Sequence, residues 1–176
     1  TAAEVIRKAD AWLNKTRYLY AEFTQIGADG KRTDGQLYLD RPGRMSFSYN
    51  PPSPMEVVAD GTSVAVRNRK LGTQVLYLVR QTPLKFLLAD KVDLAKDVKV
   101  LSVSTDPQNP SVLIEDHRTL GGTSRVRLAF DPADFALKQW TVIDPQGYKT
   151  VVSLDKTVVG VKPDAKLFVI RAQPRQ

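Results

Sequence analysis

The chain has 176 residues, of which 42% are hydrophobic, so it is long and apolar enough for one globular domain with a sizeable core. The chain as given has no cysteine, which excludes within it a disulfide framework, a thiolate metal site, a cysteine nucleophile and a lipidated N-terminal cysteine, and no apolar run is long enough to span a bilayer. The formal net charge is +7, but the basic residues are scattered and do not interleave with aromatic ones. We therefore expect no nucleic-acid binding and favour an anionic membrane surface or an acidic partner.

The N-terminal part of the chain predicts a helix followed by a strand. Residues 2–13 carry apolar side chains at helical spacing, with charged residues between them. Because this pattern begins at once, without a basic and then apolar leader, we expect that any signal peptide has been removed. From residue 18 the apolar period changes to two, and Leu19, Ala21 and Phe23 share one face of a predicted strand over 18–24.

A hairpin over residues 35–49 is the most informative stretch of the sequence. Polar and apolar residues alternate on its two strands, 35–40 and 45–49, and Asp-Arg-Pro-Gly at 40–43 predicts a tight turn between them. Arg41 therefore stands at the end of an apolar face, which is typical of a surface with a polar contact at its rim. The side chains of that face are Leu37, Leu39, Met45, Phe47 and Tyr49.

The remainder of the chain continues this pattern around one short helix. Thr82 as an N-cap and Pro83 at the first helical position predict a helix over 82–89. Asp60-Gly61 is the strongest hairpin turn, and a last apolar segment covers 167–170, before a tail at 173–176. The further strands are predicted at 55–59, 63–67, 74–79, 96–103, 111–116, 125–130, 137–144 and 148–155.

About eleven short strands at hairpin spacing predict a mainly β fold. We expect one antiparallel barrel-like or highly curved sheet, partly covered by the two helices. The sequence has no internal repeat, low-complexity stretch or linker, so we expect a single domain over residues 1–176.

The groups that would indicate an enzyme or a bound cofactor are absent from the sequence. His117 is the only histidine, and beside Glu115 and Asp116 we expect it to be a solvated residue at a strand end. There is no histidine or cysteine cluster for a metal, no Gly-x-Ser-x-Gly nucleophile elbow and no phosphate-binding glycine loop. We therefore expect no catalytic residue, no metal and no cofactor.

An ordered set of short motifs resembles the periplasmic outer-membrane lipoprotein carrier family, LolA, over nearly the whole chain. Two motifs, QTPLKFLL at 81–88 and LKQW at 137–140, are most similar to alphaproteobacterial members. The set comprises AEFTQ at 21–25, GQLYL at 35–39, RP at 41–42, MSFSY at 45–49, PP at 51–52, VADG at 58–61, QV at 74–75, TPL at 82–84, LL at 87–88, DPQG at 144–147 and LF at 167–168.

The resemblance implies an incomplete, open antiparallel β-barrel whose helices cover an apolar cavity for acyl chains. It implies a periplasmic protein that takes acylated lipoproteins from an inner-membrane lipoprotein-releasing ABC transporter and delivers them to an outer-membrane receptor; we expect it to act as a monomer. Arg41 matches the family arginine that hydrogen-bonds the closed lid, and residues 82–88 match a lid helix. The implied lipid-cavity residues are Leu19, Ala21, Phe23, Leu37, Leu39, Met45, Phe47, Tyr49, Val64, Val66, Leu84, Leu87, Leu88 and Trp140. Met45 departs from better-known enterobacterial members, which tend to have an aromatic residue there.

Simpler interpretations stand beside these. Arg41 could pair with Asp40 or Asp60 at a solvated strand end, and the apolar residues could form an ordinary core. A free lipid or another apolar ligand could be bound in place of a lipoprotein, or the domain could be a sensor or interaction module of the same fold. Provided that the N-terminus has not been trimmed, we expect the absence of cysteine to argue against the lipidated receptor of the same pathway, and we expect a lone domain to argue against the sensor.

Overall fold

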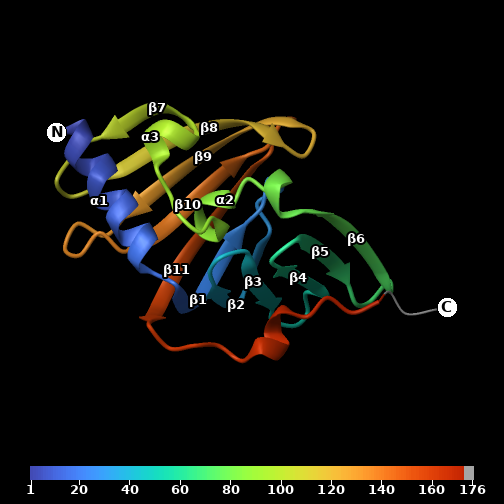
Figure 1. Cartoon of the computed structure of the whole chain (residues 1–176). Coiled ribbons are helices and arrows are strands. Elements are labelled where there is room, and N and C mark those ends of the chain that lie inside the picture. Colours follow the sequence, from blue (N-terminus) through green and yellow to red (C-terminus); the bar gives the residue numbers. More distant parts are fainter. Residues whose placement is uncertain (173–176) are drawn as a thin grey trace.

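The computed structural model describes residues 1–172, and its strands form one antiparallel sheet (Figure 1). The tail predicted at 173–176 lies outside the described residues. The strands are β1 (Tyr18–Ile26), β2 (Arg32–Asp40), β3 (Arg44–Tyr49), β4 (Met55–Asp60), β5 (Ser63–Asn68), β6 (Thr73–Leu78), β7 (Lys99–Ser104), β8 (Ser111–Thr119), β9 (Gly122–Phe130), β10 (Leu137–Ile143) and β11 (Lys149–Val159). The helices are α1 (Ala2–Lys15), η1 (Val79–Gln81), α2 (Lys85–Leu88), α3 (Leu94–Asp97) and η2 (Ala165–Phe168).

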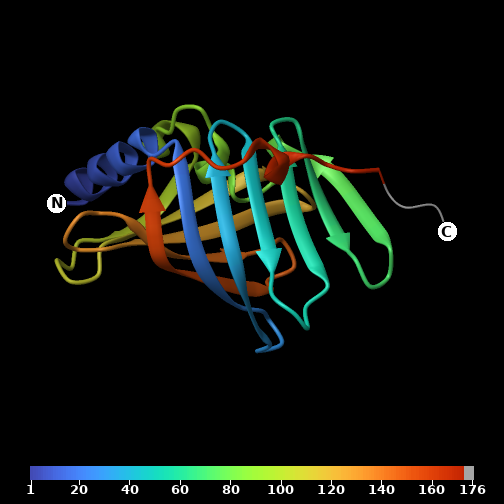
Figure 2. The ribbon, with the colours of Figure 1, turned by 90° about the horizontal axis from the view of Figure 1, so that it is seen from below.

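The strand order makes the sheet an open trough. It runs β6-β5-β4-β3-β2-β1-β11-β10-β9-β8-β7, so β6 and β7, which follow each other in the sequence, lie at opposite edges. Figure 2 shows the curvature of the sheet and the separation of the two edges. The predicted mainly β, eleven-stranded open sheet with an N-terminal helix is therefore confirmed.

Two predicted elements have wrong bounds. The helix predicted over 82–89 is only Lys85–Leu88, because Thr82 instead follows η1 and its hydroxyl accepts a hydrogen bond from the Leu84 N–H at 3.2 Å. The strand predicted over 96–103 begins at Lys99, since the residues before it form α3, whose last N–H donates to Asp93 O at 2.8 Å. Both errors arise because a helix of only four residues is too short to leave a recognisable helical periodicity in the sequence.

Several strands are longer than predicted. β2 begins at Arg32, which pairs with Ile26, and β11 runs on to Val159, which pairs with Leu19. The residues added to these two strands are mostly exposed, so apolar alternation does not show them. The segment predicted at 167–170 contains the end of η2.

The hydrophobic core fills the concave face of the sheet. Alternate residues of the strands point into it, and α1 adds Val5, Ala9, Trp12 and Leu13 from one end. Thr1 caps α1 by accepting a hydrogen bond from the Glu4 N–H at 3.2 Å. Among residues 1–172, no helix combines the length and hydropathy that a bilayer span requires.

Residues 79–98 connect β6 to β7 and thereby cross the concave face from one edge of the sheet to the other (Figure 1). We call them the crossover segment; it contains η1, α2 and α3. Asn14 of α1 holds it through two hydrogen bonds with the Val92 backbone, at 2.6 and 2.8 Å. The Leu94 N–H also donates to Asp10 Oδ1 at 3.1 Å. The crossover segment and α1 together therefore cover the trough.

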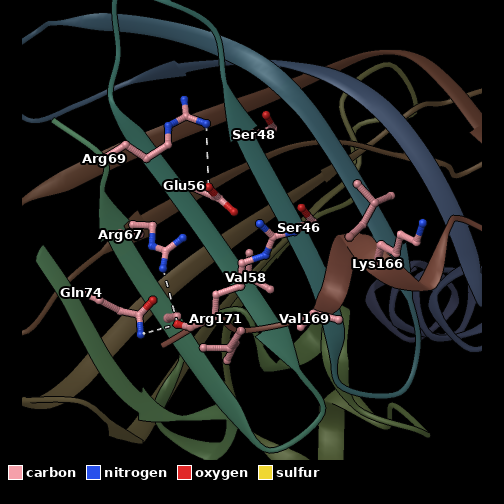
Figure 3. A pocket seen from close by; sticks show the side chains of 13 residues that line it. Ser46, Ser48, Glu56, Val58, Arg67, Arg69, Gln74, Lys166, Val169 and Arg171 are labelled. Atoms are coloured by element: carbon pink, nitrogen blue, oxygen red, sulfur yellow. Dashed lines mark hydrogen bonds and ion pairs between the residues drawn. The ribbon is translucent and has the colours of Figure 1, made fainter. Parts of the chain in front are cut away.

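The C-terminal segment, residues 160–172, covers part of the opposite face. Its η2 packs on β3 and β4, and Phe168 is buried there. Figure 3 shows a pocket of about 370 Å³ beside it, where Arg67 and Gln74 both donate hydrogen bonds to the Arg171 carbonyl and Arg69 pairs with Glu56. This contact joins the chain end to the convex side of the sheet.

Candidate functional site

The site is built where α2 closes on the concave face. α2 is a single helical turn of four residues, and three of them, Phe86, Leu87 and Leu88, are buried. Phe86 lies edge-on to Trp140 of β10 with ring centroids 6.0 Å apart, and Trp140 lies edge-on to Phe47 of β3 at 6.2 Å. The short helix thus packs against Trp140, which in turn links it to Phe47 in the other half of the trough.

The structure brings together nearly all of the residues predicted to line a lipid cavity. All of them except Val66 belong to the concave-face cluster or pack against it, and Leu84 and Tyr49 are its half-buried members. Val66, on β5, is half-buried. Because these side chains fill the space between the sheet and α2, the inner face is a packed core in this conformation.

A cluster of aromatic rings gives that inner face its shape near β1 and β3. Phe23 is edge-on to Phe47 and to Tyr49, at 5.3 and 5.1 Å between ring centroids. The Tyr49 hydroxyl donates to Gln25 Oε1 at 2.7 Å, and burial raises the pKa of Tyr49 to about 12. The hydroxyl therefore stays a neutral donor at physiological pH.

Arg41 lies in the β2–β3 turn and binds the end of α2. The residue is 5% exposed; Nε and Nη2 donate to the Ala89 carbonyl oxygen at 3.2 and 2.8 Å, and Nη1 donates to the Thr16 carbonyl oxygen at 3.2 Å. Both oxygens belong to residues that follow a helix, α2 and α1, where carbonyl groups lack intrahelical partners. Burial lowers the pKa of Arg41, while the nearby charge of Asp90 raises it.

The two carboxylates proposed as simpler partners for Arg41 are engaged elsewhere. Asp40 pairs with Arg17 and with Arg44, each at 3.3 Å. Asp60 caps the β4–β5 turn by accepting hydrogen bonds from two backbone N–H groups, as its turn chemistry predicts. Arg41 is thus joined to two helix ends by hydrogen bonds to carbonyl oxygens.

Gly43, in the same turn, completes the contact with α2. Its N–H donates to the Leu88 carbonyl oxygen at 2.8 Å, so the turn supplies donors to two successive carbonyl groups at the helix end. Gly43 has φ +77°, and a Cβ there would lie 2.7 Å from the Cα of Gly61. Only glycine therefore allows the two turns to approach each other and α2 at once.

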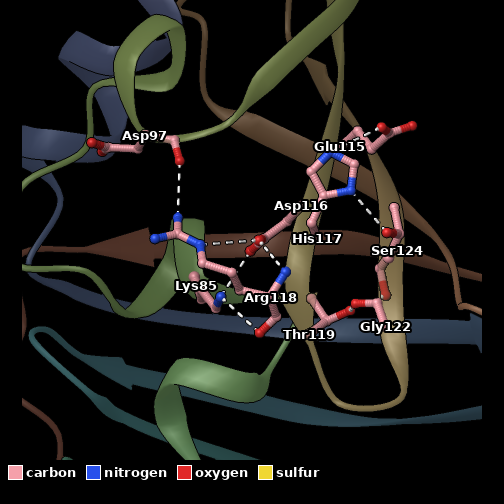
Figure 4. Close-up of polar contacts among 10 residues, drawn as sticks. Lys85, Asp97, Glu115, Asp116, His117, Arg118, Thr119, Gly122 and Ser124 are labelled. Carbon is pink, nitrogen blue, oxygen red and sulfur yellow. Dashed lines mark hydrogen bonds and ion pairs between the residues drawn. The ribbon is translucent and has the colours of Figure 1, made fainter.

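The opposite end of α2 is held by β8, through residues that the sequence analysis did not single out. Lys85 Nζ lies 2.8 Å from Asp116 Oδ2 and donates to the Arg118 carbonyl oxygen at 3.3 Å. Figure 4 shows these groups together, with the Arg118 guanidinium reaching the Asp97 carbonyl at 3.1 Å. The sequence offered one signal for Asp116. Counting by two along β8 places this charged residue on the same inward face as Val112 and Ile114, where a charge needs a partner.

His117 plays no part in this contact. It is exposed, its Nδ1 lies 2.9 Å from Thr123 Oγ1, and its Nε2 lies 3.4 Å from Glu115 Oε1. This agrees with the predicted solvated residue near a strand end. Residues 1–172 include no group of three or more His, Cys, Asp or Glu side chains arranged to hold a metal ion.

Two pockets flank α2. One, of about 360 Å³, is lined by α2, α3 and β8, with an apolar interior that includes Phe86, Leu94 and Ile114 and a charged rim that includes Lys85 and Asp116. The other, of about 440 Å³, lies between α2, η1 and the β4–β5 turn.

Comparisons with known proteins agree with this architecture. A family model described as "Outer membrane lipoprotein carrier protein LolA" matches residues 14–171. The search of curated proteins gave no match.

Three solved structures show the shared fold. A LolA superfamily protein from Nitrosomonas europaea superposes with a TM-score of 0.50 at 11% identity, covering 97% of this chain and 98% of that one. A putative outer membrane lipoprotein-sorting protein domain from Vibrio parahaemolyticus gives 0.51 at 10% identity, covering 95% and 94%. A DUF1329 family protein from Desulfovibrio piger gives 0.56 at 10% identity, covering 96% and 97%. At these identities the superpositions establish the fold alone.

Proposed function

The chain belongs to the LolA family of outer membrane lipoprotein carrier proteins, and from this premise we propose that it carries lipoproteins across the periplasm. The cargo would come from an inner-membrane lipoprotein-releasing ABC transporter and pass to an outer-membrane receptor. The carrier would act as a monomer, without a cofactor and without enzymatic activity. The observation that supports this most directly is α2, whose apolar side covers the concave face while Arg41 binds its end.

We propose that α2 is a lid and that Arg41 is its latch. The concave face is filled when α2 is in place, so acyl chains can enter only if Phe86, Leu87 and Leu88 move away. That movement breaks the hydrogen bonds from Arg41 to Ala89 and from Gly43 to Leu88. The acyl chains then replace the apolar contacts that α2 made with the sheet.

Magnitudes constrain how such a carrier works. Burying acyl chains from water is worth about 0.8 kcal/mol per methylene, so three chains of roughly sixteen carbons would give nearly 40 kcal/mol. Non-covalent binding saturates at about 20 kcal/mol. Because the cargo starts in a membrane and not in water, the net transfer is close to neutral. The carrier therefore needs a driven donor, and a lid that costs free energy to open keeps the loaded state weak enough to unload.

The direct test is lipoprotein release. The purified protein is incubated with spheroplasts that carry the cognate transporter, and labelled lipoprotein is sought in the soluble fraction as a one-to-one complex with the protein. Release that requires both the protein and the transporter is the expected result. No release, with an apolar fluorescent probe still bound, would instead favour a free-lipid binder. No release and no probe binding would mean that the apolar face is only a core.

One observation favours the second candidate, a binding protein for a free lipid. The pocket between α2, α3 and β8 has an apolar interior and a charged rim, and at about 360 Å³ it suits a small ligand better than a triacylated one. A free lipid with one chain could occupy it while α2 stays in place. Comparing a free fatty acid with a lipoprotein in the same binding assay separates the two candidates.

A further inference from the structure

We infer that the ion pair between Lys85 and Asp116 is a second latch, which holds the lid from the β8 side and must release before α2 can leave the concave face. This inference rests on the proposed lid function of α2. Arg41 binds the C-terminal end of α2, whereas Lys85 is its first residue. The two contacts therefore fix opposite ends of a helix of four residues to opposite halves of the trough.

The geometry of the pair is that of a strong, largely buried contact. Lys85 Nζ and Asp116 Oδ2 lie 2.8 Å apart, with side-chain exposures of 24% and 7%. The same ammonium group donates to the Arg118 carbonyl oxygen at 3.3 Å. A backbone hydrogen bond from Leu120 to the Gln81 carbonyl, at 2.8 Å, joins the β8–β9 turn to η1 just before the lid. The β8–β9 hairpin thus holds the N-terminal side of α2 through both a side chain, that of Asp116, and backbone groups of Arg118 and Leu120.

Asp116 is placed for this role by its register on β8. Its neighbours on the inward face are the buried residues Val112 and Ile114, where a further apolar residue would pack well. The carboxylate is instead satisfied by Lys85, by the Arg118 N–H at 2.9 Å and by the Arg118 guanidinium at 3.6 Å. Only the Lys85 contact crosses from the sheet to the lid, since Arg118 is on β8 itself.

The chemistry of an ion pair suits a latch that opens repeatedly. When α2 moves away, the ammonium and the carboxylate both become hydrated, so separation costs little compared with leaving an unpaired charge in a core. The apolar contacts of Phe86 are different, because they are recovered only when an acyl chain replaces them. The pair also stands on the rim of the pocket between α2, α3 and β8, so its release enlarges that pocket toward the concave face.

Amide hydrogen exchange of the lid tests the inference without any cargo. The variants are Lys85→Met and Asp116→Asn, and Lys85→Arg serves as a conservative rescue. Lys91→Met is the matched control, since Lys91 is an exposed lysine of the same crossover segment. The reporter groups are the Leu87 and Ala89 N–H groups, which are bonded to the Leu84 and Lys85 carbonyl oxygens.

We expect exchange at these amides to rise about three- to tenfold in Lys85→Met and Asp116→Asn, as a partly buried pair of this kind should give. The double variant should exceed neither single variant, and Lys85→Arg should restore slow exchange. Core amides of β1 and β2 should be unchanged, which separates lid opening from global destabilisation. The variants should also bind the apolar fluorophore N-phenyl-1-naphthylamine more tightly than Lys91→Met does, by a similar factor.

The outcomes separate this inference from the proposed function. Exchange in Lys85→Met and Asp116→Asn equal to that of Lys91→Met would overturn the second latch, even if the wild-type protein releases lipoproteins. Faster lid exchange with tighter probe binding supports it, even if no lipoprotein is released and the ligand proves to be a free lipid. Faster exchange with unchanged probe binding would overturn it too, because α2 would then be a loosened helix and not a lid.

Discussion

Removing the Arg41 side chain should leave the lid too easy to open. In Arg41→Leu, the carbonyl oxygens of Ala89 and Thr16 lose donors that lie 2.8–3.2 Å away in the closed structure. A hydrogen bond from a charged donor contributes about 1.5–3 kcal/mol, and in the open state water satisfies the Ala89 oxygen. Since only the Ala89 contact is broken when α2 moves, the closed state should lose about 2 kcal/mol relative to the open one, which is roughly thirtyfold in the equilibrium.

The consequence for transport follows from the same equilibrium. A carrier that opens at little cost holds its cargo more tightly, so Arg41→Leu should accept lipoprotein from spheroplasts but fail to pass it to receptor-containing membranes. Arg44→Leu is the control, because it removes the same charge three residues along the chain, where the guanidinium pairs with Asp40. Hand-off by Arg41→Leu at the wild-type rate would refute the argument, as would lid amide exchange no faster than in the control.

Three further changes should act on the lid and its anchors. Gly43→Ala places a Cβ into the neighbouring turn at φ +77° and should lower the free energy of unfolding by about 1–3 kcal/mol, measured by urea denaturation. Phe86→Ala removes the contact with Trp140 and should shift tryptophan fluorescence to longer wavelength as water reaches the ring, and probe binding should tighten because α2 loses an apolar contact with the sheet. Acidification should release the Lys85 end of the lid. Burial alone would raise the pKa of Asp116. The hydrogen bonds from Lys85 and from the Arg118 backbone N–H, together with the positive charges of the Lys85 and Arg118 side chains, outweigh this effect and lower the pKa below 3.8. The stabilisation is therefore complete above pH 3.8 and lost as pH falls through the lower folded value, which lid exchange measured against pH would show.

The sheet could be predicted because the patterns that specify it, apolar alternation within strands and turn residues between them, lie in short stretches of sequence. In β2 and β3, each inward residue follows the previous one at a spacing of two, and the turn between them has its own chemistry at Pro42 and Gly43. Antiparallel hairpins then link neighbours in the sequence to neighbours in space, which gives most of the strand order. The pairing of β1 with β11, which brings the two halves together, has no such local signal.

The crossover segment was harder because its structure depends on distant partners. Its helices are single turns, and what holds them is Arg41 from one hairpin, Asp116 from another and Asn14 from α1. The residue preferences of helix N-termini favoured Thr82 as an N-cap. In the structure the Thr82 hydroxyl instead accepts a hydrogen bond from the Leu84 N–H in a turn that follows η1. The family resemblance implied that Arg41 hydrogen-bonds a lid, whereas its partners, the carbonyl oxygens of Ala89 and Thr16, and the partners of Lys85 required the structure.

The same residues were predicted as a cavity and as a core, and the structure explains why sequence could not separate these interpretations. Phe47, Trp140 and their neighbours are buried against Phe86, so in the closed conformation they are a core by every measure of burial. What differs between a core and a closed binding site is the element that covers it. Here the cover is one helical turn, fastened by side chains at both ends, while the hydrogen bonds of the sheet continue beneath it without α2. An element so short, held by polar contacts at its ends and by the apolar contacts of Phe86, Leu87 and Leu88, is a small part of the fold, and for this reason we propose that it can leave while the sheet stays folded and so expose the concave face.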